Sequence, residues 1–168
     1  SNSELVTFRK LGSSLQGHPH VKDFEWLNTS TGSLGQGFSA SVGIALGHKY
    51  KAEETSVFVM LGDGELQEGQ VWEAAMSASH HRLNNLCAIV DYNKMQSDDL
   101  NKNIMNLEPL TQKWKAFGWN VIEIDGHNFE HIENSIKTYF KTYTSNPTVI
   151  ISNTIKGKGV SFMEGIPT

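Results

Sequence analysis

The chain has 168 residues, which is long enough for one domain with a full hydrophobic core. Hydrophobic residues make up 38% of it and charged residues 19%, which is typical of a globular protein and not of a disordered one. Its net charge of −4 argues against a general electrostatic attraction for nucleic acid or acidic membranes. No apolar run approaches the roughly 18 residues of a membrane helix and no signal peptide opens the sequence, so we expect a cytoplasmic protein.

Two local features complete this first description. Ser1-Asn2 is typical of a cloning remnant, and we expect a single domain over residues 3–168. The single cysteine, Cys87, excludes an internal disulfide. Because Cys87 lies in an apolar run, we expect it to pack as a small hydrophobic side chain.

The remaining pattern alternates between helices and strands. A small-residue turn over 29–37 precedes a predicted helix over 38–50, which has Phe38, Val42, Ala45 and Leu46 on one face. The elements predicted after it are a strand over 57–61, a helix over 68–82, a strand over 86–90, a helix over 108–118, a strand over 120–125, a helix over 129–143 and a strand over 148–155. Strands that are apolar throughout and alternate with helices predict an open, mainly parallel sheet with helices on both faces.

Open parallel sheets bind ligands beyond the carboxyl ends of their strands. Each predicted strand is followed there by a polar or glycine-rich segment. These segments are Gly62-Asp63-Gly64, Asp91-Tyr92-Asn93, Asp125-Gly126-His127 and Lys156-Gly157-Lys158-Gly159. They are the first candidates for chemistry.

The glycine-rich turn matches neither of two common nucleotide motifs. Its glycines stand at 32, 35 and 37 with no clear strand before them, which is not the dinucleotide pattern G-x-G-x-x-G. The later GKGVS segment lacks the spacing of a P-loop. The turn is then either an anion site at a helix N-terminus or a plain helix entry.

Asp63 and Asn93 form the more informative pair. They lie 30 positions apart at the ends of two buried strands, so neighbouring strands would bring both side chains to one crevice. A carboxylate and an amide oxygen suit Mg²⁺ or Ca²⁺ and not zinc. Gly62 and Gly64 would let a diphosphate approach the backbone. Singly, Asp63 is equally well explained as a helix cap and Asn93 as a turn residue; together they favour a metal–diphosphate site.

These residues resemble the thiamine-diphosphate motif, in which Gly-Asp-Gly is followed about 30 residues later by Asn. More closely, the chain resembles the transketolase family, and within it the amino-terminal half of transketolases that are split into two subunits. The likeness extends over nearly the whole chain, in LGSSLQGHP, TSTGSLGQGFSASVGIAL, GDGELQEGQVWEAAMSASHHRLNNLCAIVDYNKMQ, MNLEPLTQKWKAFGWNVIEIDGHN and NTIKGKGVSFME.

The resemblance implies a cofactor and its ligands. Asp63, Asn93 and the backbone carbonyl of Met95 would bind Mg²⁺, and the Gly64 N–H would face the diphosphate of thiamine diphosphate. Gly32 and Leu34 would line the cleft near the thiazolium ring.

The resemblance also implies three residues that act in the reaction or couple its sites. His18 would reach toward cofactor and substrate, although by itself it is more readily explained as a turn residue. Glu68 and Glu73 match acids at the family's dimer interface that are thought to link paired cofactor sites. Alternatively, both residues are solvent-exposed acids or acids at the start of a helix, with no role at an interface.

The activity implied is transfer of a two-carbon ketol unit from a ketose phosphate to an aldose. A second subunit would carry the pyrimidine-binding domain and its activating glutamate, and homodimeric contacts are expected as well. The alternatives are another thiamine-diphosphate enzyme, such as a deoxyxylulose-phosphate synthase or a 2-oxo acid dehydrogenase subunit, and a non-catalytic module that binds a partner.

The chain departs from the family at both ends. A family segment before residue 3, with its own Gly-His-Pro and a further histidine, and a histidine-bearing loop after GVSFME have no counterpart. We therefore expect a domain truncated at both ends, with weak or no binding of magnesium and thiamine diphosphate by the chain alone.

Overall fold

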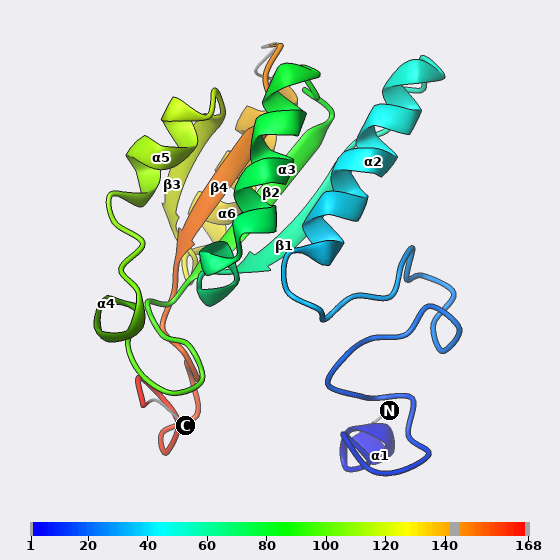
Figure 1. Ribbon diagram of the computed structural model, residues 1–168. Helices are drawn as coiled ribbons and strands as arrows, with labels where there is room; N and C mark the ends of the chain where they lie inside the picture. Colours follow the sequence, from blue (N-terminus) through cyan, green and yellow to red (C-terminus); the bar gives the residue numbers. More distant parts are fainter. Residues whose placement is uncertain (1, 142–144, 167–168) are drawn as a thin grey trace.

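The computed structural model describes residues 2–141 and 145–166 (Figure 1). Ser1 of the expected cloning remnant lies outside the described residues, as do the last two residues of the expected domain over 3–168. The end of the helix predicted to reach residue 143 also lies outside them.

Four parallel strands form the predicted open sheet. They are β1 (Val57–Gly62), β2 (Leu86–Tyr92), β3 (Asn120–Asp125) and β4 (Thr148–Asn153), in the order β1-β2-β4-β3. Because β1 and β2 are neighbours and Gly62 lies opposite Asp91, the segments that follow these two strands emerge at the same edge. This is the adjacency that the pairing of Asp63 with Asn93 requires.

Helices cover both faces of the sheet, as predicted (Figure 1). One face carries α2 (Gln36–Tyr50), α3 (Gly69–His80) and α5 (Leu110–Ala116); the other carries α6 (Phe129–Lys141). The strand residues alternate between two cores, because successive side chains of a strand point to opposite faces. In β2, Leu86, Ala88 and Val90 join the larger core, whereas Cys87 joins the smaller one beside Tyr139 of α6.

Several boundaries differ from the sequence prediction. Asp91 and Tyr92 were expected to follow their strand but are its last two residues, so only Asn93 lies beyond it. The helix expected from residue 68 begins at Gly69, because a 3₁₀ helix, η1 (Gly64–Gln67), directly precedes it. One short helix was not predicted, α4 (Asn101–Ile104), and a further short helix, α1 (Asn2–Leu5), opens the described chain.

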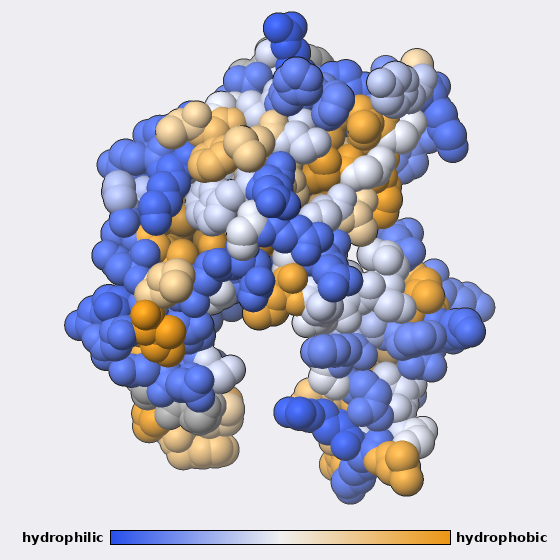
Figure 2. All heavy atoms as spheres, viewed as in Figure 1, coloured by the Kyte–Doolittle hydropathy of each residue, from blue (hydrophilic) through white to orange (hydrophobic). Residues whose placement is uncertain are grey.

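The N-terminal arm, residues 3–34, runs away from the sheet (Figure 1). Apart from the end of α1 it consists of turns, bends and irregular backbone, and several of its large apolar side chains are exposed, including Phe8 and Trp26. Figure 2 shows the molecule hollowed between this arm and the C-terminal segment. Among the helices that the structure describes, none is long and apolar enough to cross a membrane.

Candidate functional site

Asp63 is held rigidly at the end of β1. Its side chain is only 2% exposed, and its two oxygens accept backbone N–H groups from both sides of the crevice. Oδ1 accepts from Gly64 at 2.8 Å, which caps η1, and Oδ2 accepts from Lys94 at 2.5 Å. Asp63 therefore has the capping role that the sequence left open. A carboxylate has about four lone-pair positions, so each oxygen also retains room for a cation.

Asn93 occupies the facing position after β2. Its Oδ1 accepts the N–H of Met95 at 2.9 Å, so it shapes the turn that the sequence also allowed. Its Nδ2 lies 3.5 Å from Oδ2 of Asp91, and Oδ1 of Asp91 accepts the hydroxyl of Thr154, just beyond β4. The loop at Asn93 is thereby tied to two neighbouring strands.

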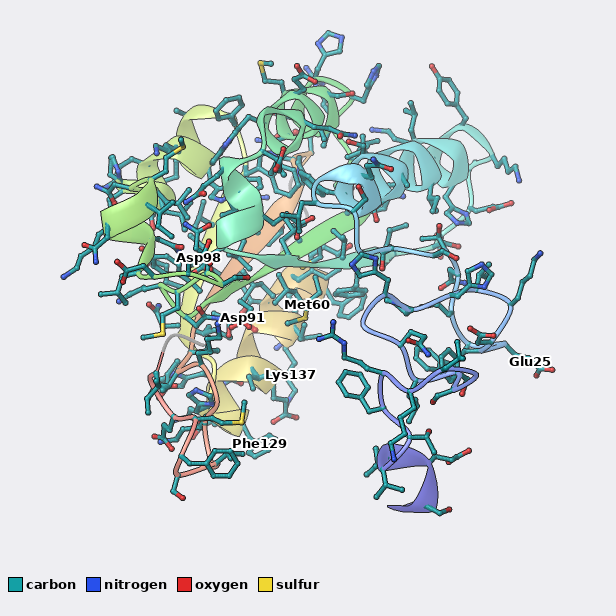
Figure 3. The ribbon with its side chains drawn as sticks, turned by 60° about the horizontal axis from the view of Figure 1, so that its bottom comes forward. Glu25, Met60, Asp91, Asp98, Phe129 and Lys137 are labelled. Carbon is teal, nitrogen blue, oxygen red and sulfur yellow. The ribbon has the colours of Figure 1, made fainter. Side chains whose placement is uncertain are left out.

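A cavity of about 400 Å³ opens between these two turns. It brings together six of the residues proposed from the sequence for cofactor or metal binding: Leu34, Gly62, Asp63, Gly64, Asn93 and Met95. Figure 3 looks toward this end of the sheet, with Asp91 at the strand ends and Asp98 on the adjoining loop. Residues from three separate parts of the chain thus share one site.

Gly32 and His18 lie together beside this cavity. Gly32 has a φ of +126°, and a Cβ built on it would lie 2.3 Å from Cγ of His18. Only glycine allows the imidazole to pack so closely against the turn. Gly32 lines a second cavity of about 550 Å³, and Leu34 lines both. His18 is exposed and lines neither cavity.

Glu68 and Glu73 are not brought to either cavity. Both side chains are exposed; Glu68 is the residue before α3 and Glu73 lies within that helix. The assigned roles at an interface stay predictions. Asp125 and His127, which received no role from the sequence, lie at the end of β3 and just after it, and Nε2 of His127 accepts the N–H of Ile155 at 2.8 Å.

Three residues at the site were not proposed from the sequence. Glu65 accepts N–H groups from both glycine-bearing turns. Gln96 and Lys156 line the 400 Å³ cavity, and Nζ of Lys156 donates to the backbone oxygen of Gln96 at 3.3 Å. Lys156 was marked only by its position after the last strand. Glu65 and Gln96 gave no signal in the sequence, because their roles depend on contacts between distant segments.

The electrostatics of the site favour a cation. Burial raises the pKa of Asp63, and the nearby charge of Asp91 raises it further, while the N–H groups of Lys94 and Gly64 act in the opposite direction. A cation between the two turns would relieve this cost, because it compensates both burial and like-charge repulsion. Within the described part of the chain, no three His, Cys, Asp or Glu side chains gather as a metal cluster. The oxygen donors that line the cavity are carboxylates, amides and backbone carbonyls, which suit a hard cation.

The fold and the site together define an open parallel α/β protein with a glycine-rich, oxygen-lined cavity at its strand ends. The family model described as "Transketolase, thiamine diphosphate binding domain" matches residues 1–166. The chain belongs to this family.

Relatives and solved structures agree with this assignment. The chain is 47% identical over 161 residues to the 6-deoxy-6-sulfo-D-fructose transketolase subunit SqwG of Clostridium sp. (strain MSTE9), an alignment that covers 96% of this chain and 58% of that relative. It is 40% identical to one of the named subunits of the apulose-4-phosphate transketolase of Phocaeicola vulgatus, with coverage of 95% and 56%. The transketolase of Campylobacter jejuni superposes with a TM-score of 0.87 at 31% identity, over 98% of this chain and 27% of that one. The chain thus spans a little over half the length of these curated relatives.

Proposed function

We propose that the chain is the Mg²⁺- and diphosphate-binding subunit of a transketolase, which transfers a two-carbon ketol unit from a ketose phosphate to an aldose. The observation that carries the proposal is the buried Asp63, which shares one cavity with Asn93 and the glycine-rich turn. Membership of the family supplies the cofactor class, and the names of two relatives as subunits support a partner.

The residues present fit Mg²⁺ and a diphosphate. Asp63, Asn93 and the carbonyl of Met95 offer hard oxygen donors at the cavity. Nε2 of Gln96 is buried there without a hydrogen-bond partner among the described residues, so it is a donor suited to an anionic oxygen. A Cβ at Gly64 would lie 3.0 Å from Cβ of Gln96, so a side chain at this position would displace Gln96.

The chain's own residues would bind and orient the cofactor. Asp63 and Asn93 would hold the cation, Lys156 and Gln96 would bind the diphosphate, and Leu34 would support the ring; all five line the cavity. Thiamine diphosphate, when bound, supplies the carbanion chemistry of two-carbon transfer. The aminopyrimidine would be held by a pyrimidine-binding domain on a second subunit. Homodimeric contacts would involve Glu68, just before α3, and Glu73 within that helix.

The test is reconstitution with a partner subunit that carries the pyrimidine-binding domain. With Mg²⁺ and thiamine diphosphate, the mixture should form ketol-transfer products detectable by mass spectrometry, whereas neither polypeptide by itself should do so. The first donors to assay are 6-deoxy-6-sulfo-D-fructose, apulose 4-phosphate and fructose 6-phosphate. Turnover by this chain alone would contradict the need for a partner. Release of CO₂ from pyruvate without ketol transfer would instead favour a decarboxylating enzyme.

A further inference from the structure

A single carboxylate joins the two glycine-bearing turns of the cavity. Oε1 of Glu65 accepts the N–H of Gly35 at 2.8 Å, and Oε2 accepts the N–H of Gly62 at 3.1 Å. Gly35 lies at the start of α2 and Gly62 is the last residue of β1. One side chain therefore bridges two segments that are distant in the sequence.

The chemistry of both donors favours a carboxylate over other side chains. The Gly35 N–H stands at a helix N-terminus, where the first N–H groups lack partners within the helix. Gly62 lies on the edge strand β1, where a backbone N–H can lack a partner strand. An ionised carboxylate accepts at both oxygens and donates at neither, and hydrogen bonds to an ion are stronger than neutral ones.

Glu65 also stands at the boundary between the two cavities. It lines the 400 Å³ cavity with Asp63 and the 550 Å³ cavity with Gly32. Its own position is fixed by η1, in which Leu66 is fully buried and its carbonyl accepts Nε1 of Trp72 at 2.8 Å. A rigid short helix thus places this carboxylate between the two turns.

We propose that Glu65 is a positioning residue that clamps the glycine turn over 32–37 to the end of β1. By holding this turn, Glu65 sets the place of Leu34 relative to Asp63, and so the place of the cofactor ring relative to the metal. It also occupies the N–H groups of Gly35 and Gly62, while Asp63 accepts the N–H of Gly64. The clamp is a feature of the chain itself, whereas its effect on the cofactor rests on the proposed function.

The variants separate the clamp from general stability. Glu65→Gln keeps the size of the side chain but turns an NH₂ group toward one of the two N–H donors. Glu65→Asp keeps the charge and shortens the reach by one methylene. Glu130→Gln is the matched control, because it makes the same chemical change on an exposed residue of α6.

The first measurement needs no cofactor. Amide hydrogen exchange of the full chain, followed by NMR, should be about tenfold faster at Gly35 and Gly62 in Glu65→Gln, since each N–H loses a charge-assisted hydrogen bond. The Met95 amide, which donates to Asn93, should exchange as in the unchanged protein. Unaltered exchange at both glycines, or equal acceleration at Met95, would overturn the clamp. Should Glu65→Gln fail to fold, the same readout applies to Glu65→Asp.

The second measurement uses the chain assembled with its partner subunit. At saturating Mg²⁺, Glu65→Gln should raise the Kd of thiamine diphosphate about tenfold, and Glu130→Gln should leave it unchanged. Equal affinity in Glu65→Gln and the unchanged protein would refute the positioning role. If the unchanged assembly binds no thiamine diphosphate, the proposed function fails, while the exchange measurement still decides whether the clamp exists.

Discussion

At the scale of single residues, the site depends on a carboxylate kept away from water. Asp63 is buried, and burial raises its pKa, with the charge of Asp91 adding to the shift. In the metal-free chain the ionised form is therefore disfavoured on folding. The contribution of Asp63 to stability accordingly increases as the pH falls through its folded pKa, since the folded state then binds the proton more tightly than the unfolded state does.

Binding of Mg²⁺ should depend on pH in the opposite sense. The metal needs the ionised carboxylate, so protons should compete with it at a higher pH than for an ordinary aspartate. We expect the Kd of Mg²⁺, measured by calorimetry on the assembled enzyme with thiamine diphosphate present, to rise by up to about tenfold per pH unit below the pKa of Asp63. Asp63→Asn should weaken binding and remove this dependence. Asp98→Asn, at an exposed position on the same cavity, is the control. It should retain both the affinity for Mg²⁺ and its dependence on pH.

At the scale of elements, three helices meet one face of the sheet through a cluster of indoles. Trp114 of α5 and Trp119 beside β3 pack edge to face at 4.9 Å between ring centroids, and both rings contact Phe38 of α2. Both are almost completely buried, but their N–H groups differ. Nε1 of Trp119 donates to the carbonyl of Ala75 in α3 at 3.0 Å, whereas Nε1 of Trp114 has no partner among the residues that the structure describes.

This difference predicts unequal costs for the same substitution. Trp119→Phe and Trp114→Phe both remove similar volume, but only Trp119→Phe removes a hydrogen bond between elements. We expect Trp119→Phe to lower the free energy of unfolding by about 1 kcal/mol more than Trp114→Phe. Urea unfolding of both variants, followed by circular dichroism, measures the difference. Equal losses would show that the bond to Ala75 contributes nothing net.

Some elements and contacts of this fold could be predicted from the sequence, and others could not. Apolar runs in β1, β2, β3 and β4 carry a strong local signal, and β3 was predicted with its observed bounds. The sequence also predicted that Asp63 and Asn93 share one cavity. This prediction used the rule that open parallel sheets bind ligands beyond the carboxyl ends of their strands, which depends only on topology. Glu65 was missed because its partner Gly35 is distant in the sequence, and a glutamate at a helix start gives no hint of such a contact. The helix predicted from about residue 68 begins at Gly69, whereas the 3₁₀ turn before it was not predicted, because it depends on the cap by Asp63, a contact that hydrophobic periodicity does not register.

At the scale of the whole molecule, the arm over residues 3–34 contrasts with the sheet domain. The arm carries His18 to Gly32 at the edge of the site but exposes much of its apolar surface, including Trp26. A segment with little buried surface opens at low free energy, so it should be cut by proteases first. Lys10 and Lys22 in the arm are exposed, whereas Lys113 is partly buried in α5 and its Nζ donates to the carbonyl of Leu107 at 2.7 Å.

Limited digestion with trypsin therefore tests both the arm and the place assigned to His18. Cleavage after Lys10 and Lys22 should be at least about tenfold faster than after Lys113, since the first two sites open without disrupting the core.

If His18 contacts the bound cofactor, Mg²⁺ and thiamine diphosphate added to the assembled enzyme should slow the cut after Lys22, because a ligand stabilises the state that binds it. Gly32→Ala, which would drive a methyl group into the imidazole of His18, should remove this protection but leave cleavage after Lys113 unchanged. Protection that survives in Gly32→Ala would mean that the arm is ordered by contacts other than the packing of His18 on the glycine turn.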